Sequence, residues 1–153
     1  MIAMKPDLVR STPESQRISL LSTLAEWLLA LVPGLLALVP LLIGGLPQTQ
    51  DGDNHLLRAA IYPSIFATGT LVPDWYADFA NGFGYPLGLF YPPLTAVVSG
   101  LATLISGSAI VGMSVVFVIC ALVASSGAYV LGRQIGGSRW SGLVAASTFA
   151  LAP

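Results

Sequence analysis

Residues 109–132 read AIVGMSVVFVICALVASSGAYVLG and contain no charged side chain. A bilayer core about 30 Å thick requires roughly 20 apolar residues in a helix, so this run is long enough to cross a membrane. Hydrophobic residues make up 55% of the chain and charged residues only 8%, whereas soluble domains carry about 25% charged residues. So few charges cannot cover a water-exposed surface. The composition therefore predicts an all-α integral membrane protein.

The apolar runs and the breaks between them predict about four transmembrane helices. The predicted segments are a polar tail at 1–18, membrane helices at 19–46, 87–105 and 109–132, a polar loop at 47–86, and the start of a further membrane helix at 140–153. Residues 87–105 also fit a re-entrant or interfacial segment. A complete crossing is favoured, because irregular backbone exposed to lipid leaves polar groups unpaired.

The basic residues predict which side of the membrane each end occupies. Lys5, Arg10 and Arg17 precede the first apolar run, so the positive-inside rule places the N-terminus in the cytoplasm, below the inner (plasma) membrane. The polar loop then lies outside. Counting four helices places Arg133 and Arg139 outside as well, whereas the same rule prefers them inside. The sequence leaves the side of this turn open.

The net charge, the single cysteine and the small residues indicate which partners the chain is suited to bind. A net charge of −1 with no basic stripe argues against nucleic acid. The single cysteine, Cys120, excludes a disulfide within the chain and is expected to be a small buried side chain. Small residues throughout 109–132 favour close helix packing in lipid, including packing against other transmembrane subunits.

Residues 51–62, at the start of the polar loop, are predicted to form a short amphipathic helix on the membrane surface. Asp51 or Asp53 would cap it by accepting backbone N–H bonds, and Pro63 would end it. Its apolar face comprises Leu56, Leu57, Ala60 and Ile61, and its other face comprises Asp51, His55, Arg58 and Tyr62.

The second half of the loop is predicted to contain another short helix. Gly69 and Thr70 indicate a turn, Pro73 suits the first turn of a helix, and Asn81-Gly82 would end it. Its aromatic residues are expected to anchor the chain at the lipid headgroups. These are Trp75, Tyr85 and Tyr91.

The charged residues of the first loop helix allow two kinds of chemistry. Asp51, Asp53 and His55 could bind Mg²⁺ or Mn²⁺, which often bridges to phosphate oxygens. Alternatively, one carboxylate could act as a general base on a sugar-acceptor hydroxyl, or the group could be a solvated helix cap. Arg58 could contact a phosphate, extend to the membrane surface or pair with Asp51.

Several short motifs follow one another in this loop. Residues 51–58, DGDNHLLR, have the shape D-x-x-x-H-L-x-R, and they precede GTLVPDW at 69–75, GFGYP at 82–86 and FYPPL at 90–94. This order resembles the N-terminal part of bacterial polytopic membrane proteins related to 6-pyruvoyl-tetrahydropterin synthase. That family has the architecture of the GT-C glycosyltransferases. The resemblance covers about residues 20–153.

The resemblance implies an outer loop with two juxtamembrane helices and an essential acidic residue. Asp51 matches that acid best by position and Asp53 is the second choice, either as a base or as a Mg²⁺ or Mn²⁺ ligand; Gly52 occupies the place of the usual second acid. The implied substrate-binding residues are His55, Arg58 and Tyr62. The implied substrate is a polyprenyl-phosphate-linked sugar on the outer membrane face.

Members of that family have many more membrane helices than this chain. The chain is therefore expected to be a fragment that is inactive alone. The alternative is a non-catalytic accessory transmembrane subunit of a larger membrane complex.

Overall fold

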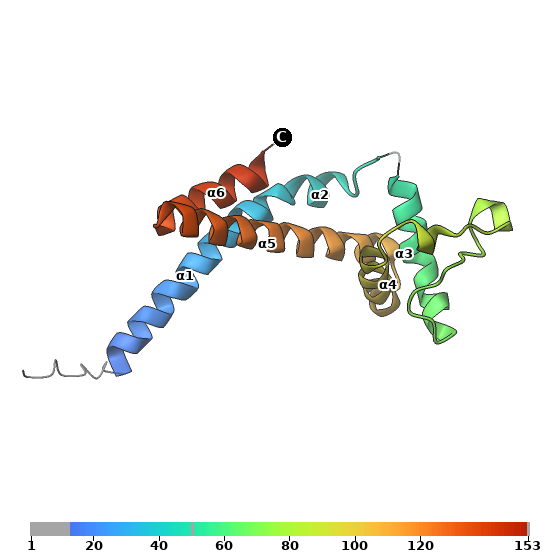
Figure 1. The fold of residues 1–153 in the computed structure, drawn as a ribbon, viewed down its shortest axis with the longest axis horizontal. Coiled ribbons are helices and arrows are strands. Elements are labelled where there is room, and N and C mark those ends of the chain that lie inside the picture. Colours follow the sequence, from blue (N-terminus) through green and yellow to red (C-terminus); the bar gives the residue numbers. More distant parts are fainter. Residues whose placement is uncertain (1–12, 50, 153) are drawn as a thin grey trace, which may run out of the picture.

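The computed structural model describes residues 13–49 and 51–152, and their regular structure is helical (Figure 1). In chain order the elements are α1 (Pro13–Ala37), α2 (Val39–Gly44), α3 (Gly52–Ala67), the 3₁₀ turns η1 (Ala80–Gly82) and η2 (Leu87–Leu89), α4 (Leu94–Ser106), α5 (Ala109–Gly136) and α6 (Arg139–Leu151). Within the described residues, the only strand-like pairing is an isolated bridge between Tyr76 and Tyr85. The all-α prediction is confirmed.

The first predicted membrane helix is divided in two. α1 ends at Ala37, and α2 begins at Val39 with Pro40 in its first turn. Proline has no N–H and its ring clashes with the preceding turn, so the helix breaks there. Pro33 lies within α1 without ending it.

α5 is the helix that meets the requirements for crossing a membrane. It has 28 residues and a mean hydropathy of 2.4 over its most apolar window, and no other helix of the described residues is both as long and as apolar. At 1.5 Å per residue it is about 42 Å long, which exceeds a bilayer core.

α4 begins later than the sequence predicts. The predicted helix at 87–105 is instead a 3₁₀ turn, η2, an irregular stretch through Pro92-Pro93, and a helix of 13 residues from Leu94. Proline is tolerated in the first turn of a helix but not in its interior, so the helix starts only after the proline pair. α4 is therefore about 20 Å long.

The helices pack as two groups along α5. α1 and α6 cross its C-terminal half around Ala30, Tyr129 and Ala146, whereas α3 and α4 lie at its N-terminal end (Figure 1). Figure 1 also shows α4 running crosswise to α5 rather than alongside it.

Small residues of α5 bring these helices close together, as predicted. Gly112 lies against Ser99 and Thr103 of α4, and Gly132 lies against Ser141 and Ala145 of α6. The Ser125 hydroxyl donates a 2.7 Å hydrogen bond to the Ala30 carbonyl of α1. These small residues therefore serve the packing of this chain's own helices.

Many large apolar side chains are exposed along the outside of these helices. On α5 they include Val123 and Ile135, which are 66% and 80% exposed. Cys120 is exposed beside them, so the prediction that it is buried is wrong. Exposed apolar surface of this extent is typical of a protein surrounded by lipid or covered by partners.

Candidate functional site

The candidate site is built on α3, which is longer than the sequence predicts. The helix passes through Pro63 and ends at Ala67, where Thr68 and then Gly69, with a φ of +79°, turn the chain. The prediction that Pro63 ends it is wrong. Tyr62 and Phe66, on either side of the proline, pack into the same aromatic cluster and hold the helix together through it.

Asp51 and Asp53 lie at the exposed start of α3. Asp51 occupies the position just before the helix, but its carboxylate caps no backbone N–H group. Asp53 lies in the first turn, where the helix dipole favours an acid. Among the residues that the structure describes, no three His, Cys, Asp or Glu side chains lie close enough together to hold a metal. Mg²⁺ or Mn²⁺ binding by Asp51 and Asp53 remains a prediction.

His55, Arg58 and Tyr62 share the face of α3 on which the sequence places them, but that face is packed. His55 is half-buried, Arg58 is 2% exposed and Tyr62 is fully buried. The apolar Leu57, on another side of the helix, is 40% exposed. The prediction of a helix with this polar face on the membrane surface is therefore wrong for Arg58 and Tyr62.

Tyr62 is buried because α3 packs against α4, a contact that the local sequence pattern does not predict. A Cβ atom at Gly100 would lie 2.3 Å from the Cβ of Tyr62, so only glycine lets the two helices approach this closely. α3 therefore presses its tyrosine side onto α4.

The predicted second loop helix is absent from residues 71–79. Tyr76 and Tyr85 instead exchange two backbone hydrogen bonds of 2.9 and 3.0 Å, and η1 makes the turn between them. Gly84 lies against the indole of Trp75, where a side chain would not fit. The pairing at Tyr76, followed by a turn through residues 77–79, is incompatible with a helix that starts at Pro73.

A cluster of buried side chains holds the loop onto α3 and α4. Its members are Tyr62, Tyr76, Phe79, Leu87 and Ala96. The hydroxyl groups of Tyr62 and Tyr76 are 3.2 Å apart, and the two rings lie within contact distance. Burial, and then the hydrogen bond with Tyr76, raise the pKa of the Tyr62 phenol well above its usual range, and the nearby Arg58 charge opposes that rise only in part.

Arg58 lies at the edge of this cluster, enclosed by the loop. Its guanidinium carbon is 5.9 Å from the centre of the Tyr76 ring and 5.8 Å from that of Tyr91. Its Nη2 donates a long hydrogen bond of 3.4 Å to the Pro92 carbonyl. Its Nε is buried and has no partner.

No carboxylate of the described residues forms an ion pair with this buried cation. Both ion pairs found among the described residues involve Glu26, at the other end of the molecule, and Asp51 does not pair with Arg58. A buried donor without an acceptor destabilises a fold by about 1–3 kcal/mol, and a charged one by more. Arg58 therefore needs either an anion or another role that compensates for this loss.

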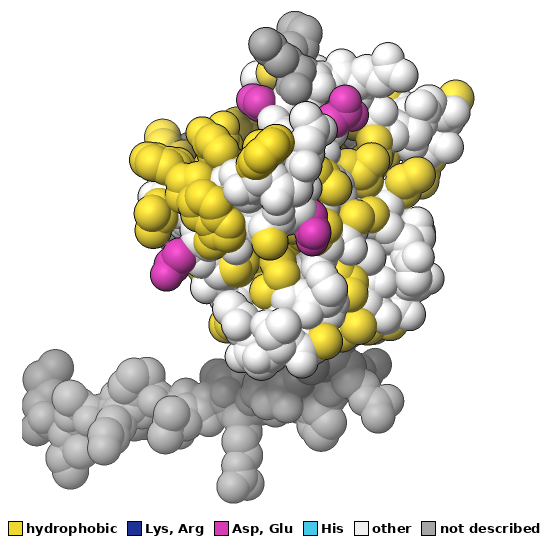
Figure 2. All heavy atoms as spheres, turned by 90° about the vertical axis from the view of Figure 1, so that its right-hand side faces the viewer, with side chains coloured by type: hydrophobic (Ala, Val, Ile, Leu, Met, Phe, Trp, Pro, Cys, Tyr) yellow, Lys and Arg dark blue, Asp and Glu magenta, His cyan; other side chains and the backbone are white. Residues whose placement is uncertain are grey.

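The surface at this end of the molecule is apolar and acidic. Figure 2 shows it with groups of hydrophobic side chains, acidic side chains between them, and no visible Lys, Arg or His among the described atoms. Its exposed aromatic residues include Trp75, Phe83 and Phe90. Arg58, the buried cation at this end of the molecule, is thus covered by the loop.

Sequence reasoning missed Tyr76, Tyr91 and the Pro92 carbonyl as neighbours of Arg58. Pro92 is 34 residues away from Arg58 in the chain, and no local spacing rule links them. The sequence signal was only that Tyr91 stands before a proline pair, and that was interpreted as an anchor at the headgroups.

A second charged group lies where α1, α5 and α6 meet. Arg133 Nη1 is 3.1 Å from Glu26 Oε2, and Arg139 Nη1 is 3.8 Å from Glu26 Oε1. The Tyr129 hydroxyl donates to the same Glu26 oxygen at 3.2 Å. The turn containing both arginines therefore lies beside α1.

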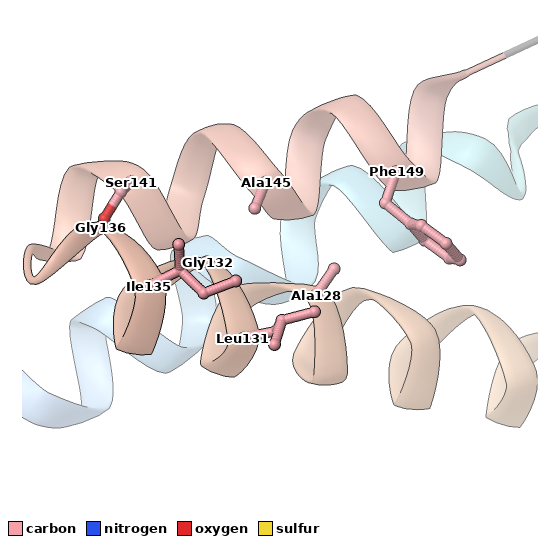
Figure 3. A pocket seen from close by; sticks show the side chains of 8 residues that line it. All are labelled: Ala128, Leu131, Gly132, Ile135, Gly136, Ser141, Ala145 and Phe149. Atoms are coloured by element: carbon pink, nitrogen blue, oxygen red, sulfur yellow. The ribbon is translucent and has the colours of Figure 1, made fainter.

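The crevice between α5 and α6 offers little chemistry. It has a volume of about 340 Å³ and, as Figure 3 shows, it is lined by small and apolar side chains with the single hydroxyl of Ser141. Nothing in it would fix the orientation of a polar ligand.

No known protein family, curated protein or solved structure matches the chain. The resemblance to the GT-C-like family therefore stays a prediction, and the site has to be argued from its own geometry.

Proposed function

We propose that this chain is the N-terminal, membrane-embedded part of a GT-C-like glycosyltransferase, which holds a polyprenyl-phosphate-linked sugar at the outer membrane face. The observation that carries the proposal is Arg58, a buried cation with an unpaired Nε and with no carboxylate partner in the part of the chain that the structure describes. A lipid phosphate supplies the negative charge and the acceptor oxygens that this guanidinium lacks. Hydrogen bonds between charged groups are the strongest ones available to it.

The enclosure of Arg58 suggests how a phosphate would reach it. The Pro92 carbonyl accepts a hydrogen bond of only 3.4 Å, and the Tyr91 ring covering the guanidinium is itself 41% exposed. Displacement of residues 91–92 would exchange one weak acceptor for phosphate oxygens. The exposed apolar residues around the loop would keep the lipid chain of the same molecule in hydrocarbon.

The acidic residues would act on the sugar rather than on the phosphate. Asp51 lies seven positions before Arg58, which is about 10 Å along the helix axis. That separation leaves room for a sugar between the two groups. Asp51, with Asp53 as second choice, would serve as a base for the acceptor hydroxyl or as a Mg²⁺ or Mn²⁺ ligand, and half-buried His55 would lie between them.

The arrangement in the membrane belongs to the same proposal. With the N-terminus in the cytoplasm, α1 and α2 would lead from Glu26 to the outer face, and α5 would return to bring Arg133 back to Glu26. Arg133 and Arg139 then satisfy the positive-inside rule. α4, about 20 Å long and crosswise to α5, fits the interfacial alternative better than a complete crossing. The crossing segments would then be α1 with α2, α5 and the start of α6, instead of about four complete helices.

Binding measurements with the chain in lipid nanodiscs would test the proposal. Polyprenyl phosphate is expected to bind and uncharged polyprenol is not. Arg58→Gln should weaken phosphate binding by about tenfold or more, because it removes a charge-assisted hydrogen bond. Arg58→Lys should keep part of the affinity, because it retains the positive charge but loses the planar fork of donors.

The acidic residue gives a second readout in the same experiment. Asp51→Asn should bind the phosphate normally if Asp51 is a base, and should lose a Mg²⁺-dependent part of the affinity if it is a ligand. In the complete protein this variant should insert but transfer no sugar. Wild-type phosphate binding by Arg58→Gln would overturn the proposal and would favour the accessory-subunit alternative.

A further inference from the structure

The charged group formed by Glu26, Arg133 and Arg139 contains more positive than negative charge. One carboxylate faces two guanidinium groups, and among the described residues neither arginine has another acidic partner. A positive charge of about one unit is therefore left over. In the interior of a protein such an imbalance would be expensive, but both arginines are more than half exposed, at 52% and 57% of their side chains.

Most N–H groups of the two arginines have no protein acceptor among the described residues. Arg133 uses only Nη1, which donates to Glu26 and, at 3.4 Å, to the Tyr129 hydroxyl. Arg139 lies 3.8 Å from Glu26, beyond hydrogen-bond distance. An arginine side chain has five N–H donors in a planar fork that matches phosphate oxygens. The pair is thus arranged to bind an anion from outside the chain.

Two tryptophans indicate where this group lies relative to a bilayer. Trp27 packs on Tyr129 with ring centres 5.4 Å apart, and the Arg139 guanidinium lies 5.6 Å from the centre of the Trp140 ring. Trp140 is 66% exposed. Tryptophan is enriched at the headgroup level of membranes, and here both indoles lie at the end of the apolar helix α5.

We propose that Arg133 and Arg139 bind the phosphate of an anionic phospholipid, at the junction of α1, α5 and α6. Glu26 and Tyr129 hold Arg133 in place, and the more loosely held Arg139 closes on the phosphate. Basic residues between membrane helices on the cytoplasmic side are suited to anionic headgroups. The proposal rests on α5 crossing the bilayer, and it is independent of the sugar-phosphate site at Arg58.

Quenching of Trp140 fluorescence by brominated lipids would test this site. The full chain would carry Trp27→Phe and Trp75→Phe, so that Trp140 is the only tryptophan. In phosphatidylcholine vesicles containing an equal small fraction of one brominated lipid, brominated phosphatidylglycerol should quench Trp140 more strongly than brominated phosphatidylcholine. The expected preference is about fivefold in relative affinity, for the one unit of positive charge that Glu26 does not neutralise.

Three variants separate a binding site from arginines that only reach toward water. Arg139→Gln should remove most of the preference, and Arg139→Lys should keep part of it. Arg139→Gln breaks only the longer of the two ion pairs, and the melting temperature of each variant reports whether it is folded. For a folded Glu26→Gln chain, the preference should increase because the competing carboxylate is gone.

Equal quenching by both lipids, in the chain that retains Arg133 and Arg139, would overturn the proposal. Loss of the preference in excess inorganic phosphate would overturn the assignment to a lipid, because it would identify free phosphate as the ligand. Absence of quenching by either lipid would instead contradict membrane insertion, on which the proposal rests.

Discussion

Arg58 and Tyr62 show how single side chains of α3 depend on the loop that covers them. Among the described residues, Arg58 contacts two aromatic rings and one carbonyl but no acid. The hydroxyl groups of Tyr62 and Tyr76 form a hydrogen bond. Arg58 and Tyr62 are polar residues that were expected at a membrane surface and lie in a packed cluster. The packing of the loop therefore depends on the guanidinium of Arg58 and the hydroxyl of Tyr62.

Tyr62 should make the stability of the protein sensitive to alkaline pH. Burial raises the pKa of its phenol above the usual value near 10, so the folded state holds the proton more tightly than the unfolded state. The stabilisation is fully present below about pH 10 and is lost as the pH rises toward the folded-state pKa.

Tyr62→Phe should therefore be less stable than the unsubstituted protein at neutral pH, by about 1 kcal/mol for the lost hydrogen bond to Tyr76. That difference should shrink above about pH 10. Thermal unfolding in detergent at a series of pH values measures it, with Tyr85→Phe at an exposed tyrosine as the control. A difference that stays constant up to alkaline pH would contradict the prediction.

The helices of this chain approach one another through glycine and serine rather than through large apolar side chains. α3 meets α4 at Gly100, α4 meets α5 at Gly112, and α6 meets Tyr129 at Gly142. In lipid the hydrophobic effect does not drive helices together, so close packing at small residues has to do so. A methyl group added at such a contact separates the helices.

Gly100→Ala should destabilise the protein by about 1–3 kcal/mol, because its Cβ would overlap Tyr62. Gly127→Ala is the matched control, since it also lies in a helix and its Cβ would meet nothing within 4 Å. The control should be neutral or more stable by about 0.4–1 kcal/mol. Unfolding midpoints of the two variants compare them. Equal midpoints would show that α3 and α4 are not in the described contact.

In the whole molecule, ion pairs with Glu26 hold the turn that contains Arg133 and Arg139 beside α1. α3, α4 and the aromatic loop lie at the opposite end of α5 (Figure 1). α4 lies crosswise at that end, and its C-terminal end is joined to the start of α5 by a short turn. The two charged groups of the protein, at Arg58 and at Glu26, would thus face opposite sides of a bilayer.

Single-cysteine labelling of intact cells should reveal this arrangement. In a Cys120→Ala background, Ser106→Cys should react with a membrane-impermeant maleimide from outside, whereas Gln134→Cys and Ser11→Cys should react only after permeabilisation. If α4 crosses the membrane completely, Ser11→Cys and Gln134→Cys will label from opposite sides. Labelling of the last two from the same outer side would reverse the orientation but keep α4 at the interface.

Composition and hydrophobic periodicity are enough to predict that the protein is helical, that α5 is apolar enough to span a membrane, and which residues of α3 share one face. Composition and the 3.6-residue period are local properties, and they do not depend on which helices meet.

Contacts that form only in the folded chain explain why α3 continues past Pro63, why Tyr76 pairs with Tyr85, and why Arg58 is covered by Tyr91 and Pro92. Each of these depends on a contact between segments far apart in the chain, such as Tyr62 with Gly100 or Tyr76 with Tyr85. Local propensity is worth a few tenths of a kcal/mol per residue, and burial of an aromatic side chain is worth more, so the packing prevailed. The same packing explains why Arg58 is buried between aromatic rings although the sequence predicts it at the surface.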